Sequence, residues 1–171
     1  GLKSSCSFSV TVNDTEAPVV TVPANITVSN DPGQCSAVVN FAVSATDNCA
    51  VAGIVSNIPS GTTFPTGTTT VNVVATDTSG NTTSRDFTVT VLDTEKPVIN
   101  CPANIEASNN PGTCSRSNVV FTATASDNCP GVTITYSIDS GSTFPVGTTP
   151  VTVTATDAAG NQATCTFTVT I

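Results

Sequence analysis

Apolar residues alternate with polar or small residues along much of the chain. Val39, Phe41, Val43 and Ala45 form one such run, and positions 119–125 form another with the same spacing. A period of two residues, rich in Val and Thr, is typical of antiparallel strands with one buried face. Pro-Gly and Gly-Asn turn signals separate the runs. The pattern therefore predicts many short strands and no helix.

The whole pattern returns after about eighty residues. The matching segments are 14–18 with 93–97, 23–26 with 102–105, 47–49 with 127–129, 63–65 with 143–145, and 75–81 with 155–161. We therefore expect complete repeats at 14–92 and 93–171. The run Cys-x-Phe-x-Val at positions 6–10 matches the close of the second repeat, so we expect 1–13 to be the last strand of a truncated upstream repeat. A tandem array of this kind usually supplies length and surface rather than chemistry.

Each repeat has room for about seven short strands, which favours an immunoglobulin-type β-sandwich. The predicted fold class is all-β, with tandem immunoglobulin-like sandwiches arranged end to end. In the first repeat the expected strands are 19–29, 37–46, 51–57, 70–76 and 84–92, with two weaker strands around Phe64.

The second repeat carries a recurring set of motifs. They are Cys-Pro-x-Asn-Ile, Pro-Gly-x-Cys, Ala-x-Asp-Asn-Cys, Thr-Phe-Pro-x-Gly-Thr, Ala-Thr-Asp-x-x-Gly-Asn and Cys-x-Phe-x-Val. This set resembles the hyalin repeat (HYR) domain, and the first repeat matches it with Val22 and Arg85 in place of the first and last Cys. The resemblance implies an immunoglobulin-like, non-catalytic extracellular module linked to adhesion, often in long bacterial surface proteins.

Composition narrows the function. The chain has 12 acidic and 4 basic residues, a net charge of −8 and no His. This charge argues against nucleic acid and anionic membranes as partners, and no apolar run is long enough for membrane insertion. Without His, Ser-His and Cys-His nucleophilic catalysis are excluded, and we expect no enzyme. Seven Cys favour an oxidising compartment, so we expect an extracellular or cell-surface location.

Two Cys are predicted to pair within the second repeat. Cys101 and Cys165 have no counterpart in the first repeat, where both positions are lost together. They lie near the starts of the first and last strands, which are neighbours in the sandwich. We therefore predict a Cys101–Cys165 disulfide, and we expect Cys6 to be half of the same bridge in an upstream repeat.

The pairing of Cys35 is less direct. About ten extended residues of roughly 3.3 Å each separate Cys35 from Cys49, whereas a disulfide needs Cα atoms within about 7 Å. The sandwich topology favours Cys35–Cys129 instead, joining adjoining repeats, with Cys49 bonded upstream and Cys114 downstream. Pairing within each repeat and free thiols are the alternatives.

Eight acids fall into two equivalent sets. They are Asp14, Glu16, Asp47 and Asp77, and Asp93, Glu95, Asp127 and Asp157. In an immunoglobulin sandwich their loops share one pole, and hard oxygen ligands crowded together suit Ca²⁺. Calcium at the joints is thus a candidate cofactor. The alternative is that these Asp residues hydrogen-bond their own turns or solvate a linker.

The sequence therefore predicts a structural stalk or filament segment of a large surface or secreted adhesin, stiffened by disulfides and possible calcium. Its expected partners are the adjacent repeats of the same chain. The alternative is an adhesion module that itself binds a glycan or protein receptor, for which Tyr136 is the one candidate aromatic anchor. Donor-strand polymerisation through residues 6–12 is a further possibility.

Overall fold

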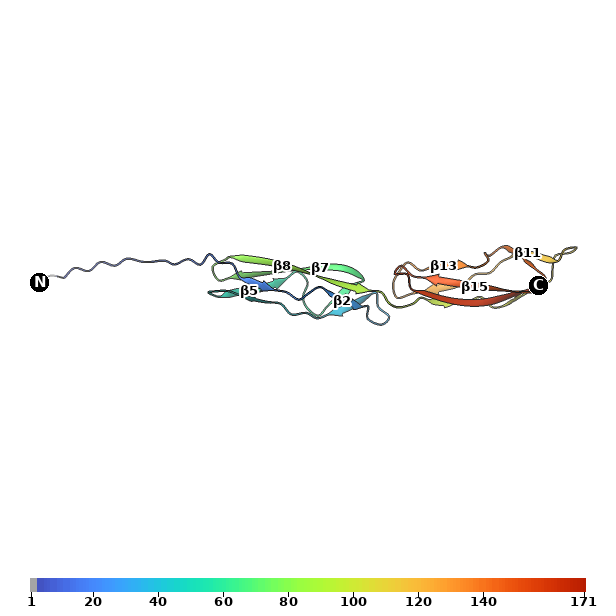
Figure 1. Cartoon of the computed structure of the whole chain (residues 1–171), viewed down its shortest axis with the longest axis horizontal. Coiled ribbons are helices and arrows are strands. Elements are labelled where there is room, and N and C mark those ends of the chain that lie inside the picture. The colour runs from blue at the N-terminus through green and yellow to red at the C-terminus, as the bar shows by residue number, and fades with distance from the viewer. Residues whose placement is uncertain (1–2) are drawn as a thin grey trace. The chain divides into compact units, whose positions relative to one another are not determined.

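The computed structural model describes residues 3–171, and this part of the chain contains sixteen strands and no helix (Figure 1). The strands of the first repeat are β1 (Val19–Thr21), β2 (Ile26–Ser29), β3 (Ser36–Val39), β4 (Ser44–Thr46), β5 (Val51–Ser56), β6 (Thr62–Pro65), β7 (Gly67–Asp77) and β8 (Thr82–Leu92). Those of the second are β9 (Val98–Asn100), β10 (Ile105–Glu106), β11 (Ser115–Val119), β12 (Thr124–Ser126), β13 (Thr133–Tyr136), β14 (Ser142–Pro145), β15 (Thr148–Thr156) and β16 (Gln162–Thr170). Over the described residues there is accordingly no helix that could cross a membrane.

Both repeats have the same sheet topology. A four-stranded sheet has the order β2-β8-β7-β5 in the first repeat and β10-β16-β15-β13 in the second. Two short antiparallel pairs complete each repeat: β1–β4 with β3–β6, and β9–β12 with β11–β14. The predicted all-β fold of tandem immunoglobulin-like sandwiches is confirmed.

The first strand of each repeat is divided between two sheets, although the sequence predicts one continuous strand. In the second repeat β9 pairs antiparallel with β12, and β10 then pairs parallel with β16. Pro102 lies between them. Because proline has no N–H to donate to a ladder, it favours the point where the chain leaves one sheet for the other.

The predicted strand 37–46 is also divided, into β3 and β4. In the gap, the Phe41 N–H donates to Ser60 Oγ at 2.8 Å instead of to a neighbouring strand. The equivalent Phe121 N–H donates to Ser140 Oγ at 2.9 Å. A side-chain acceptor that satisfies the backbone donor allows the ladder to be interrupted.

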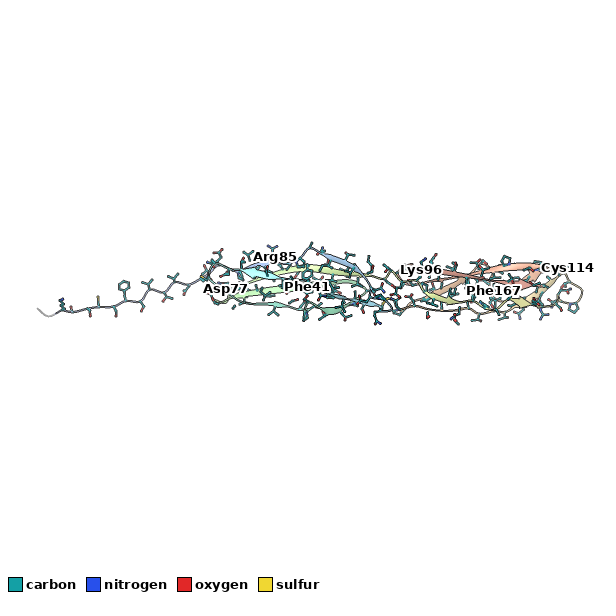
Figure 2. All side chains as sticks on the ribbon, turned by 90° about the horizontal axis from the view of Figure 1, so that it is seen from below. Phe41, Asp77, Arg85, Lys96, Cys114 and Phe167 are labelled. Atoms are coloured by element: carbon teal, nitrogen blue, oxygen red, sulfur yellow. A yellow bond between two sulfur atoms is a disulfide. The ribbon has the colours of Figure 1, made fainter. Side chains whose placement is uncertain are left out.

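Alternating side chains fill the interior of the second repeat. The rings of Phe121 and Phe167 lie edge to face with centroids 4.9 Å apart, and Phe144 packs on Phe121 at 6.3 Å. Val151, Val153 and other apolar residues of β15 and β16 complete the cluster. The first repeat has an equivalent Phe41–Phe87 pair at 5.0 Å, and Figure 2 labels Phe41 and Phe167, one from each repeat.

Contacts divide the chain into two compact units, which do not coincide with the repeats. Unit 1 contains the described residues up to Thr27 together with Val38–Phe64 and Thr68–Thr90. Unit 2 contains Val91–Ile171 together with two short segments of the first repeat, Val28–Ala37 and Pro65–Gly67.

The N-terminal segment forms no strand between residues 3 and 18. Its apolar residues Phe8, Val10 and Val12 are 88%, 75% and 90% exposed. Positions 1 and 2 of the predicted upstream strand lie outside the described residues. The assignment of 1–13 to another repeat stays a prediction.

Candidate functional site

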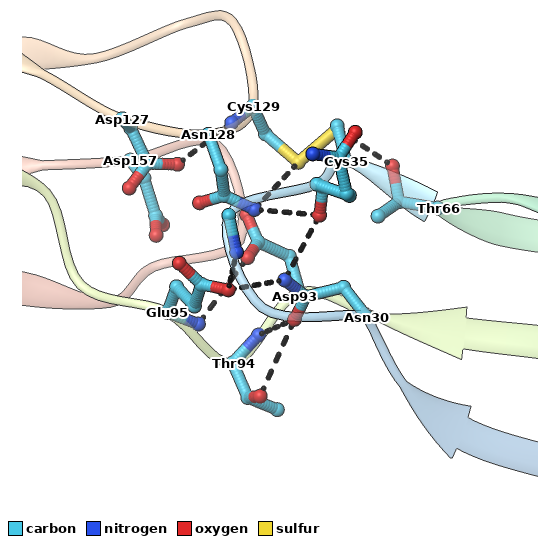
Figure 3. Close-up of a disulfide and its surroundings, with 12 residues drawn as sticks. Asn30, Cys35, Thr66, Asp93, Thr94, Glu95, Asp127, Asn128, Cys129 and Asp157 are labelled. Atoms are coloured by element: carbon cyan, nitrogen blue, oxygen red, sulfur yellow. Dashed lines mark hydrogen bonds between the residues drawn. A yellow bond between two sulfur atoms is a disulfide. The ribbon is translucent and has the colours of Figure 1, made fainter. Parts of the chain in front are cut away.

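The site lies in unit 2, around the disulfide of Cys35 and Cys129 (Figure 3). Cys35 directly precedes β3, and Cys129 follows β12 in the loop to β13. Their Cα atoms are 4.9 Å apart although 94 positions separate them in the sequence. Only 6% of Cys129 is exposed. The bond joins the turn 30–35 covalently to the loop 127–129.

Hydrogen bonds tie the same turn to the segment 93–95. The buried Asn30 side chain donates from Nδ2 to Gln34 O and to Glu95 Oε1, both at 3.0 Å. Its Oδ1 accepts the Thr94 N–H at 3.1 Å. Glu95 Oε1 also accepts the Gly33 N–H at 2.6 Å. Both the nitrogen and the oxygen of the Asn30 side-chain amide are therefore hydrogen-bonded, and the Glu95 carboxylate accepts two hydrogen bonds.

A third contact comes from Asn128, beside the disulfide. Its Nδ2 donates to Gln34 O at 3.0 Å. The preceding Asp127 accepts the Cys129 N–H through Oδ2 at 3.0 Å, which holds the loop in a local turn. We call the turn 30–35 and the loops 93–95 and 127–129, taken together, the Cys35–Cys129 cluster.

We expect the substitution Asn30→Ala to destabilise unit 2 by about 2 kcal/mol, because it removes several hydrogen bonds, one of them to a carboxylate. Asn109 is the matched control. It occupies the equivalent place in the second repeat, but its Nδ2 donates only within its own turn, to Asn110 O and Thr113 O, and it is exposed. Asn109→Ala should cost less than about 1 kcal/mol. Calorimetric melting of both variants measures the difference, and equal losses would contradict the role given to Asn30.

The second disulfide joins Cys101 to Cys165, with Cα atoms 6.0 Å apart. Both residues pack against the apolar cluster of the second repeat. Within residues 3–171 the free cysteines are Cys6, Cys49 and Cys114, and all three are exposed. Repulsion from the Asp14 carboxylate is the largest cause that raises the pKa of the Cys49 thiol, followed by desolvation.

Three predicted acids of unit 1 converge. Asp14, Asp47 and Asp77 each place a carboxylate oxygen within 4.8 Å of the other two. Asp14 Oδ2 and Asp47 Oδ1 are buried without a hydrogen-bond partner. Glu16 contributes differently, since its N–H donates to Asp14 Oδ1 and its carbonyl accepts from Asn81.

Asp77 is only 2% exposed and organises its own turn. It accepts the Ser79 and Asn81 N–H groups at 2.8 Å, and the Asn81 amide at 2.7 Å. Burial on its own raises the pKa of Asp77, but the hydrogen bonds from Asn81, Ser79 and Gly80 outweigh it and lower the pKa. The carboxylate is therefore held in its charged form.

The second set behaves similarly in unit 2. Asp93 and Asp127 lie within 4.8 Å of each other, and Asp93 Oδ2 and Asp127 Oδ1 are buried without a partner. Asp157 accepts the Asn161 backbone N–H at 2.7 Å and the Asn161 side-chain amide at 2.8 Å. Burial on its own raises the pKa of Asp157, but the hydrogen bonds from Asn161, Gly160 and Ala159 outweigh it and lower the pKa. Glu95 lies in the Cys35–Cys129 cluster, where its Oε1 accepts from Asn30 and Gly33.

Sequence reasoning missed Asn30 and Gly33, whereas it placed Asn128 close to the second acid set without giving it a hydrogen-bond partner. Asn30 and Gly33 belong to a segment that was interpreted only as a tight turn, and Gly33 has the positive φ of 71° that such a turn requires. The available signal was that Asn and Gly recur at the same places in the second repeat, as Asn109 and Gly112. A turn alone needs the Gly, whereas the Asn also serves a contact outside the turn.

The fold and the repeated loops define a class of tandem immunoglobulin-like sandwich repeats. The family model described as the HYR domain matches residues 13–91 and again residues 92–171. The chain therefore belongs to the HYR domain family, and the resemblance seen in its motifs is confirmed.

Hyalin of Strongylocentrotus purpuratus is 41% identical over 98% of this chain, which corresponds to 15% of hyalin. The serine-rich adhesin for platelets of Staphylococcus aureus strain MRSA252 is 29% identical over 90% of the chain, which corresponds to 13% of that adhesin. The chain thus spans a small part of the relatives that it matches. Among solved structures, Drosophila N-cadherin EC1-4 is similar over 91% of this chain and 49% of the cadherin chain. The sequence identity is 15% and the TM-score is 0.42.

Proposed function

We propose that this repeat pair is a structural, non-catalytic segment of an extracellular adhesion protein, in which the Cys35–Cys129 cluster fixes the orientation of successive repeats. The observation that carries the proposal is the disulfide itself, which connects a turn of repeat 14–92 to a loop of repeat 93–171. The kinship with hyalin and with a staphylococcal adhesin supports the extracellular, adhesive setting. Adjacent repeats are the proposed partners.

The contacts of the linker support a stiff connection. Thr94 and Glu95 both bond Asn30, and the buried Pro97 limits the backbone that follows. A flexible linker would leave such polar groups to water. Here side-chain hydrogen bonds hold the linker, and the disulfide beside it joins a turn of the first repeat to a loop of the second.

The alternative role, binding of a glycan or protein receptor, has less support. Tyr136, its candidate anchor, accepts the Ala123 N–H through its hydroxyl at 2.9 Å. The Tyr136 ring also packs on Phe121, with centroids 5.5 Å apart. Because the hydroxyl is hydrogen-bonded and the ring packs on Phe121, Tyr136 stabilises the sandwich and has little surface for a ligand.

We further propose calcium as the cofactor of the two acid sets. A buried carboxylate oxygen without a hydrogen-bond partner is costly unless a cation or water satisfies it. Asp14, Asp47 and Asp77 would hold one ion, and Asp93 and Asp127 would take part in holding another, where the buried Asn128 Oδ1 also has no partner. These are hard oxygen donors of the kind that Ca²⁺ prefers. Cys129 is excluded as a ligand because its sulfur belongs to the disulfide. A bound ion would supply the positive charge that these loops lack.

Calcium should raise the melting temperature of the chain and EDTA should lower it, with about 2.7 kcal/mol of stabilisation once free calcium exceeds the Kd a hundredfold. Titration calorimetry should give two sites. Asp47→Asn should remove one and Asp127→Asn the other, whereas Asp139→Asn, at an exposed acid outside both sets, should keep both. An unchanged melting curve in EDTA, or the same rise in melting temperature with magnesium, would contradict the proposal that the two acid sets bind calcium.

The structural role itself is tested by the orientational freedom of the two repeats. Oxidised protein should behave as one body in solution, and a Cys35→Ala, Cys129→Ala protein should not.

A further inference from the structure

The connection between β1 and β2 contains an Asn-x-Thr sequence at residues 25–27, the acceptor pattern for N-linked glycans. Asn25 and Thr27 are both exposed. Asn25 is exposed although repeat 93–171 follows it, and its counterpart Asn104 is exposed although repeat 14–92 precedes it. A neighbouring repeat on either side therefore leaves this position open to modification.

The side-chain amide of Asn25 is held in an orientation that leaves its nitrogen free. Its Oδ1 accepts the Thr88 N–H of β8 at 3.0 Å, while its Nδ2 makes no hydrogen bond with any residue in the range 3–171. N-glycosylation replaces one of the two hydrogens on Nδ2 by a sugar and keeps Oδ1 as an acceptor. The hydrogen bond to Thr88 can therefore persist in the glycosylated chain.

A second Asn-x-Thr sequence, at residues 81–83, lacks this freedom. Asn81 Nδ2 donates to Asp77 Oδ2 at 2.7 Å, to Glu16 O at 3.2 Å and to Asp14 O at 3.3 Å. Because two amide hydrogens already serve three acceptors, a sugar on Nδ2 would break at least one of these bonds and displace the groups packed around it. The folded turn therefore does not accommodate a glycan on Asn81.

The edge of the four-stranded sheet gives a glycan on Asn25 a function. β2 is an edge strand in the order β2-β8-β7-β5, and its four residues carry no charge. The equivalent edge strand of the second repeat, β10, carries Glu106 at the position of Thr27. An open edge can pair with a strand of another chain unless a charge or a covering group prevents it. A hydrated sugar beside β2 would supply the protection that Glu106 supplies in β10.

We propose that Asn25 carries an N-linked glycan that covers the edge of β2, and that Asn81 is unmodified in the folded protein. The inference rests on the extracellular setting of the proposed function, because the chain must pass through a secretory pathway to be modified. A glycan is also consistent with the exposed, turn-flanked position of Asn25, which is typical of acceptor sites in secreted proteins.

The modification is a glycosyl transfer from a lipid-linked oligosaccharide, catalysed by an oligosaccharyltransferase. Asn25 Nδ2 forms a bond to C1 of the first sugar, and the bond from C1 to the pyrophosphate oxygen breaks. The lipid pyrophosphate is the leaving group, and one proton of the amide is released. The chain supplies only the acceptor amide and the Thr27 hydroxyl that completes the recognition pattern.

The test expresses the chain through the secretory pathway of animal cells, with Asn13→Gln to remove a third Asn-x-Thr sequence at residues 13–15. Peptide mapping of the secreted protein, before and after treatment with peptide-N-glycosidase, should find a glycan on Asn25 and none on Asn81. Asn25→Gln should lose the glycan completely. An unmodified Asn25, or equal occupancy of Asn25 and Asn81 in the folded protein, would overturn the proposal.

Asn104 is the matched control for the acceptor. It directly precedes β10, and its Oδ1 accepts the Thr168 N–H at 2.9 Å, as that of Asn25 accepts from Thr88. Glu106 stands where the pattern requires Thr or Ser, so Asn104 should be unmodified. Glu106→Thr should add a glycan at Asn104, and its failure to do so would contradict the claim that this position of the sandwich accepts one.

The covering role is measured by association in solution, with Ser in place of the exposed free cysteines Cys6, Cys49 and Cys114 in every protein. Thr27→Ala and Thr27→Glu both abolish the acceptor pattern. In analytical ultracentrifugation Thr27→Ala should associate, whereas Thr27→Glu and the glycosylated chain should stay monomeric, because only these two protect the edge. Equal behaviour of all three would overturn the covering role. None of these failures would change the orientation of the two repeats within one chain, so they are distinguishable from failure of the proposed function.

Discussion

Replacement of both Cys101 and Cys165 by Ala should lower the free energy of unfolding of the second repeat by about 4 kcal/mol. The bridge closes a loop with a sequence separation of 64, and chain-entropy reasoning gives about that value for such a loop. For a domain of this size the loss corresponds to a drop of about 20 °C in melting temperature. Alanine is preferred to serine because both cysteines pack against the apolar cluster.

The first repeat is the internal control for this prediction. It folds with Val22 and Arg85 at the equivalent positions and has no such bridge. Its calorimetric transition should therefore stay in place while that of the second repeat moves down. A shift of less than about 1 kcal/mol in the second repeat would mean that the bridge contributes little beyond native packing.

The second large effect is expected from the loss of the Cys35–Cys129 disulfide. Each remaining hydrogen bond of the cluster is worth only about 1 to 3 kcal/mol. Such contacts open locally far more often than a covalent bond. We therefore expect the Cys35→Ala, Cys129→Ala protein to keep both sandwiches folded but to lose the fixed orientation between repeats 14–92 and 93–171.

The sequence was sufficient to predict the fold because local signals and repetition agreed. Alternation around Phe41 and Phe121 indicated strands with one buried face, and turn residues marked their ends. The divided strands were missed because a period of two residues does not say which sheet a strand joins. Pro23 and Pro102 were the available signs of the switch between sheets.

The candidate site was less predictable. Cysteine positions and strand lengths restricted the possible pairings of Cys35, since the extended strand argued against Cys49. The roles of Asn30 and Glu95 could not be derived in this way. A hydrogen bond between residues 65 positions apart depends on the angle at which two loops meet, and no local pattern encodes that angle. Glu95 was accordingly assigned to the acid set, because its linker was expected at the same pole of the sandwich as the loops of the other acids.

The most direct test of the central claim is the measurement of residual dipolar couplings of the backbone amides in both repeats. In oxidised protein, the couplings of 14–92 and 93–171 should fit a single alignment tensor, and they should still do so in the Cys101→Ala, Cys165→Ala control below its melting temperature. In the Cys35→Ala, Cys129→Ala protein the two repeats should require separate tensors. Separate tensors in the oxidised protein itself would contradict the claim that the Cys35–Cys129 cluster holds neighbouring repeats in one orientation.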